Sequence, residues 1–163
     1  MAKSNLGGVF LILGDRDRAR RMYAESLEIC QRIGDRSKAA GDLAGLGSVM
    51  RAAGDTEQAS KYQTEAISIF QEIGDKSSAA EVQTGLAELL IDQGKPADAA
   101  TLAAKAVDEF EKERAPRDES RAAAALSRAL LAQGKVASAE KEIEQAIALT
   151  AKYHDRDAEL AVL

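Results

Sequence analysis

Glycine returns at every twentieth position over much of the chain, usually with aspartate after it. The series comprises Gly14-Asp15, Gly34-Asp35, Gly54-Asp55, Gly74-Asp75, Gly94-Lys95 and Gly134-Lys135. Glycine just past a helix adopts the left-handed conformation that ends the helix, and aspartate accepts hydrogen bonds from the N–H groups that open the next one. The pattern predicts helices of about four to five turns joined by very short turns.

Two positions in the series lack glycine. Arg114-Ala115 and His154-Asp155 stand where Gly-Asp would fall. We interpret His154 as a substitute for a turn glycine, so that a further helix is expected to start after it.

Alternate segments differ, which makes the repeating unit forty residues long with two helices in each unit. Small residues recur with this period at Ala19, Ala59, Ala99 and Ala139, and leucine recurs at Leu6, Leu46, Leu86 and Leu126. Small residues let helix backbones approach closely, while aliphatic residues fill the layer between units. We expect an all-α fold, a right-handed α-solenoid of antiparallel helix pairs. Its predicted units are residues 1–34, 35–74, 75–114 and 115–154, with 155–163 starting a further helix.

The second unit carries a family resemblance in Leu46-Gly47, Met50, Gly54, Ala59, Tyr62 and Ala66. This pattern resembles the tetratricopeptide repeat (TPR), and the forty-residue length is similar to the long-helix form in kinesin light chains and bacterial signalling proteins. The chain departs from the family in two places. The early aromatic is replaced by Lys3, Leu43, Gln83 and Ala123. The glycine of Leu46-Gly47 becomes Ala87 and Ser127 in the last two units.

Composition argues against several classes of function. The net charge is −5, with the acidic excess in residues 81–163, whereas nucleic-acid binding normally needs a basic face. No apolar run reaches the length of a membrane span. We expect no nucleic-acid partner and no membrane segment within this chain, and a cytoplasmic location by default.

Catalytic and metal-binding patterns are also missing from the sequence. His154 is the only histidine, and Cys30 has no partner at metal-ligand spacing. Cys30 falls at the register of Phe70 and Phe110, which predicts a core position. The acidic run from Asp108 to Glu113 is interpreted as a solvated helix face. We therefore expect no enzyme activity, no catalytic residue, no metal and no cofactor.

The TPR resemblance implies a groove, lined by the first helix of each unit, that receives a peptide or a partner helix. The residues at the corresponding positions that offer polar groups are Asn5, Ser48, Arg51, Thr84, Glu88, Asp92 and Arg128. Small or apolar residues complete the lining at Gly8, Ala44, Ala124 and Leu131. The alternative, in which Arg51 and Glu88 only pair with each other, stays open. Some TPR proteins hold the terminal carboxylate of a peptide with lysine and asparagine at set positions of the groove. This clamp is not reproduced here, because the positions equivalent to Asn5 in the later repeats carry Gly45, Gly85 and Ala125.

The resemblance makes a scaffold that binds a protein or peptide segment the leading hypothesis, with the chain forming part of a larger bacterial protein. One alternative is a sensory or regulatory module of a signalling kinase or transcription regulator. Another is self-association, for instance as a homodimer through exposed terminal helices.

Overall fold

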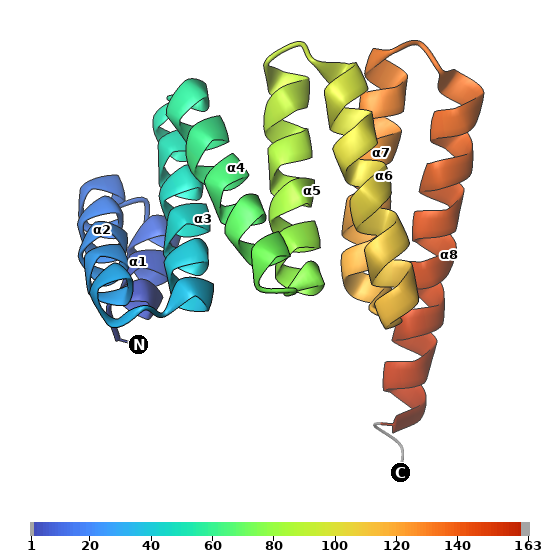
Figure 1. Cartoon of the computed structure of the whole chain (residues 1–163). Helices are drawn as coiled ribbons and strands as arrows, with labels where there is room; N and C mark the ends of the chain where they lie inside the picture. The colour runs from blue at the N-terminus through green and yellow to red at the C-terminus, as the bar shows by residue number, and fades with distance from the viewer. Residues whose placement is uncertain (1, 161–163) are drawn as a thin grey trace. The chain divides into compact units, whose positions relative to one another are not determined.

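The computed structural model describes residues 2–160, with side chains described for residues 3–151. This part of the chain forms eight α-helices and no strand (Figure 1), which confirms the all-α prediction. The helices are α1 (Ala2–Ile12), α2 (Arg16–Ile33), α3 (Arg36–Ala53), α4 (Thr56–Glu72), α5 (Lys76–Asp92), α6 (Pro96–Glu113), α7 (Pro116–Ala132) and α8 (Val136–Leu160). The chain divides into two compact units between Val82 and Gln83, inside α5, and these are the first and second units named below, whereas the forty-residue stretches are called repeats. None of the described helices is both long enough and apolar enough to cross a bilayer.

The turns have the chemistry that the Gly-Asp pairs predict. All six glycines of the series have φ between 72° and 84°, the left-handed region. The carboxylates of Asp15, Asp35, Asp55 and Asp75 each accept a hydrogen bond from the backbone N–H three residues later, at 3.0–3.1 Å. Each Gly-Asp pair therefore ends one helix and caps the next.

The two positions without glycine behave differently from each other. Arg114 still ends α6, with φ of 56°, the one described non-glycine residue with positive φ. Pro116 follows at the first position of α7, and a residue before proline is disfavoured in the helical conformation. At His154-Asp155 no such proline follows, and α8 continues unbroken to Leu160. The prediction of a turn at 154 and a new helix from 155 was wrong for the described residues up to 160.

The first unit has a core built from α2, α3, α4 and the start of α5. Its central cluster is formed by Ala40, Leu43, Ala66, Phe70 and Ala79. Tyr62, Ile69 and Val82 are half-buried against this cluster. In Figure 1 the unit begins with α1 and α2 as antiparallel neighbours, followed by α3 and α4. Alanine at the closest approaches lets the helices pack at short distance.

The second unit repeats this arrangement with smaller side chains. Its cluster comprises Ala87, Ala99, Ala103, Ala125, Leu126 and Ala129, contributed by α5, α6 and α7. Phe110 is buried near the end of α6. The antiparallel helix α8 then packs along α7, and its last turns run beyond the ends of α6 and α7 (Figure 1).

Candidate functional site

The first unit places three of the expected groove residues on α1 and α3. Asn5 is exposed, while Ser48 and Arg51 are half-buried. The Ser48 hydroxyl donates to the carbonyl of Ala44 at 3.1 Å, one turn earlier. Ser48 is therefore held along its own helix, and Arg51 has an intramolecular interaction.

The second unit places the other four on α5 and α7. Thr84 is only 3% exposed, so this side chain offers almost no surface to a ligand and was wrongly expected in the lining. Glu88 is half-buried, and Asp92 is exposed at the end of α5. Arg128 is exposed on α7.

The exposed stripe of α7 carries arginine and leucine together. Arg117, Arg121 and Arg128 are exposed at spacings of four and seven residues, which place them on one face of the helix. Arg121 donates to Asp118 at 3.2 Å. For Arg128, the described side chains contain no carboxylate partner. Leu131, three residues after Arg128, is 52% exposed.

Tyr23 occupies a slot between α1 and α3 that the sequence alone did not indicate. A Cβ atom on Gly45 would lie 2.4 Å from the Tyr23 ring, and one on Gly7 would lie 2.9 Å from it. Glycine at both positions therefore makes room for the ring. A Cβ atom on Gly8 would lie 3.4 Å from the Tyr23 hydroxyl, so this hydroxyl comes close to a position of the expected groove lining.

The same slot explains why a carboxylate clamp does not fit here. An asparagine at position 45, at the register of Asn5, would overlap the ring of Tyr23. The packing of α2 against α3 thus requires glycine where that clamp would need an amide side chain.

A buried polar cluster lies beside Tyr23, between α1, α2 and α3. Asp42 is 1% exposed, and its Oδ1 accepts a hydrogen bond from the Ser4 hydroxyl at 2.6 Å. Ser4 also shares a hydrogen bond of 2.8 Å with Ser26. The Cys30 thiol donates to Asp42 Oδ2 at 3.7 Å. Because Val82 and Ala122 stand at the register of Asp42, this cluster is specific to the first unit, and it ties α1 to α2 and α3.

Burial governs the ionisation of the groups around Asp42. Burial, and next the charge of Asp42, raise the pKa of the Cys30 thiol above its ordinary value. The same two causes raise the pKa of the Tyr23 hydroxyl. Both groups therefore remain protonated near neutral pH, and the Cys30 thiol lacks the thiolate character of a nucleophile. The prediction that Cys30 occupies a core position is confirmed.

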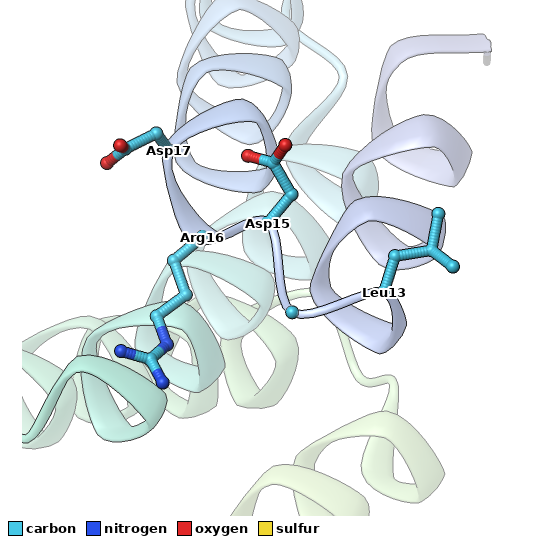
Figure 2. A pocket seen from close by; sticks show the side chains of 5 residues that line it. Leu13, Asp15, Arg16 and Asp17 are labelled. Atoms are coloured by element: carbon cyan, nitrogen blue, oxygen red, sulfur yellow. The ribbon is translucent and has the colours of Figure 1, made fainter.

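A hollow at the α1–α2 turn does not gather functional groups. Its volume is about 530 Å³, and it is lined by the consecutive residues 13–17. Figure 2 shows the side chains of Leu13, Asp15, Arg16 and Asp17 pointing in different directions, so they do not converge on a common point.

Acidic side chains do not assemble into a metal site in the described part of the chain. No group of three or more His, Cys, Asp or Glu side chains there could hold a metal ion. In the acidic run of α6, Asp108, Glu111 and Glu113 are exposed, and Lys112 donates to Asp108 at 2.5 Å. These residues form the solvated face that the sequence predicts.

These antiparallel helix pairs, joined by Gly-Asp turns with a forty-residue period, define a TPR-type helical repeat. The chain belongs to the MalT-like TPR region family, whose model matches residues 1–162. The predicted TPR identity is therefore confirmed. A comparison with curated protein sequences finds no match.

Two solved structures have a similar fold. The crystal structure of BtubC (BKLC) from P. vanneervenii superposes with a TM-score of 0.84 at 22% identity, over 93% of this chain and 63% of BtubC. The apo form of RapI superposes with a TM-score of 0.87 at 11% identity, over 96% of this chain and 57% of RapI. The chain thus spans less than two thirds of either protein. At these identities the likeness establishes the shared helical repeat fold.

Proposed function

We propose that this chain binds a protein or peptide segment, and that the exposed face of α7 makes the principal contact in the second unit. The observation that supports this most is the exposed Arg128 guanidinium, without a carboxylate partner among the described side chains, next to the half-exposed Leu131. Arginine is one of the residue types that are enriched at the energetic centres of protein interfaces.

The chemistry of this face points to the kind of segment that binds. Arg128 supplies donors in the planar arrangement that matches a carboxylate, and Leu131 supplies apolar surface one turn away. Ala124, half-buried one turn earlier, leaves room for a ligand backbone. The segment we propose therefore carries an aspartate, a glutamate or a terminal carboxylate close to an apolar side chain.

Selection from a random peptide library displayed on phage tests this proposal. Peptides enriched on the wild-type chain should contain a carboxylate near an apolar residue. Their affinity, measured by fluorescence anisotropy, should fall about tenfold or more for Arg128→Ala, which corresponds to about 1.4 kcal/mol, and it should also fall for Leu131→Ser.

The matched control is Lys105→Ala, which removes an exposed cation from α6 in the same unit. This variant should bind as the wild type does. Equal losses for Lys105→Ala and Arg128→Ala would show that the binding is non-specific charge attraction. Enrichment of peptides without any carboxylate would contradict the assigned role of Arg128.

A further inference from the structure

A pocket in the first unit lies between the C-terminal halves of α2 and α4 and the start of α3. Its volume is about 170 Å³. Its floor is formed by the buried residues Cys30, Ala39 and Leu43. Its rim is formed by exposed polar residues, chiefly Gln31, Arg36 and Glu65. The pocket therefore offers apolar surface at its base and charged groups at its mouth.

Most of the residues around the pocket recur forty positions later, in the next repeat. Five of them have equivalents of the same or similar type, namely Gln71, Gly74, Asp75, Lys76 and Ala79. At the floor, however, Phe70 stands at the position equivalent to Cys30. Phe70 is 5% exposed and belongs to the same packed cluster as Ala79. A phenyl ring thus packs in the region of Ala79, whereas the smaller Cys30 leaves a pocket beside the equivalent Ala39.

The volume of the pocket fits one aromatic ring. An apolar cavity of about 150 Å³ in a protein interior binds benzene, whereas drug-sized ligands occupy pockets of about 300–1,000 Å³. The pocket above Cys30 is close to the first size. Because buried phenylalanine stands at the equivalent register at Phe70 and again at Phe110, we expect a phenyl group to be the best-fitting occupant.

The charges at the rim favour a cation. Glu65 is exposed, and no described side chain forms an ion pair with it. Arg36 is already paired with Glu72, so its charge is compensated. Asp35, which accepts a hydrogen bond from the backbone N–H of Lys38, adds a second carboxylate to the lining. The mouth of the pocket therefore carries a net negative charge, which complements an ammonium group.

We infer that this pocket binds a small arylalkylamine, a molecule with one phenyl ring and one primary ammonium group. The ring lies on Ala39 and Leu43, in the place that corresponds to phenylalanine in the next repeat, and the ammonium group faces Glu65. This inference does not depend on the proposed peptide site, because that site lies on α7 in the second unit.

Titration of the isotope-labelled chain with 2-phenylethylamine, followed by amide chemical shifts, tests the inference. The shifts should change at Ala39, Leu43 and Ile69 and yield a dissociation constant. Cys30→Phe should abolish these changes, because the ring of the new side chain then fills the pocket. Circular dichroism and thermal melting check that this variant is folded.

The neutral analogue 2-phenylethanol tests the role of the charge. It should bind at the same residues about fivefold more weakly than the amine. Glu65→Gln should weaken binding of the amine by the same factor and leave binding of the alcohol unchanged. Because Glu65 is exposed, this comparison remains decisive even where Cys30→Phe disturbs the fold.

Glu28→Gln serves as the control, since it removes an exposed carboxylate from α2 outside the pocket. This variant should bind both probes as the wild type does. The inference is overturned if millimolar 2-phenylethylamine leaves the amide shifts around the pocket unchanged, or if a folded Cys30→Phe variant binds as the wild type does. Equal affinity for the amine and the alcohol would overturn it as well, because Glu65 would then not select a cation.

Discussion

The Ser127 hydroxyl on α7 donates a buried hydrogen bond to the carbonyl of Ala139 on α8, at 2.9 Å. In the first unit the equivalent residues are Gly47 and Ala59, and a Cβ atom on Gly47 would lie 3.3 Å from the Ala59 carbonyl. The serine that replaces the family's glycine therefore finds an acceptor on the facing helix. This departure from the TPR pattern preserves close packing and adds a hydrogen bond between the helices of one pair.

Removal of the Ser127 hydroxyl should weaken the α7–α8 pair. We expect Ser127→Ala to lower the free energy of unfolding by about 0.5–1.5 kcal/mol, the usual net contribution of one hydrogen bond. Chemical denaturation of the wild type and of Ser127→Ala measures this difference in the free energy of unfolding. Ser138→Ala, at an exposed position on α8, should change stability by less than about 0.5 kcal/mol. Equal effects of the two substitutions would show that the bond contributes nothing specific.

Gly47 and Gln63 should be coupled energetically. A Cβ atom on Gly47 would lie 2.7 Å from Gln63 Cγ, so we expect Gly47→Ala to destabilise by about 1–3 kcal/mol through overpacking. Gln63→Ala should relieve this overlap, since the third forty-residue repeat has alanine at both equivalent positions, Ala87 and Ala103. It would also remove the buried Gln63 Oε1, which has no hydrogen-bond partner among the residues that the structure describes.

A double-mutant cycle tests this coupling. The two substitutions together should cost less than the sum of their separate effects, by about 0.5–3 kcal/mol. Strict additivity would indicate that the helices shift apart at Gly47 instead of meeting Gln63.

Replacement of leucine by alanine at equivalent positions of α3 and α1 should lower the free energy of unfolding by different amounts, according to how deeply each leucine is buried. Leu46→Ala should destabilise by about 2–5 kcal/mol because the residue is buried against neighbouring helices. Leu6→Ala, at the same register on α1, should cost about 1 kcal/mol or less. Chemical denaturation of the two variants beside the wild type measures the difference. A cost for Leu6→Ala as high as that for Leu46→Ala would mean that α1 buries this leucine in solution.

The cap at Asp15 should make a pH-dependent contribution to stability. The backbone N–H of Arg18, and next the Arg18 side chain, donate to this carboxylate and hold its pKa below the ordinary value of 3.8. Because the folded-state pKa is the lower one, the stabilisation is complete above the unfolded-state pKa. It is lost as pH falls through the folded-state pKa.

Urea denaturation of the wild type and of Asp15→Ala from neutral to acid pH measures this effect. The difference in stability should be largest at neutral pH and shrink on acidification. Asp15→Asn keeps a capping oxygen that does not titrate, so its stability relative to Asp15→Ala should not follow this pH dependence. A constant difference between wild type and Asp15→Ala at all pH values would contradict the assigned role of the carboxylate.

The sequence was most informative where structure depends on local chemistry. The Gly-Asp turns, the aspartate caps and the burial of Cys30 follow from residue types at a fixed period. The continuation of α8 past His154 could not be predicted in this way, because the loss of the turn glycine has two different outcomes. At Arg114, which is followed by Pro116, the turn is kept, whereas at His154 the helix continues.

Side-chain packing between helices was the part that the sequence could not predict. The Tyr23 slot and the contacts of Asp42 depend on how three helices approach one another, and periodicity does not report that distance. The burial of Thr84 was missed for the same reason. Only the glycines at positions 7 and 45 hinted at the slot, and glycine inside a helix commonly marks a close approach.

Chemical-shift mapping on the assigned amide spectrum, during titration with a peptide selected on the wild-type chain, tests the binding proposal most directly. The account predicts that the largest shifts in the second unit cluster on α7 around Arg128 and Leu131, and that Arg128→Ala removes them. Chemical-shift changes concentrated on α6 and α8, with α7 unaffected, would contradict the binding proposal.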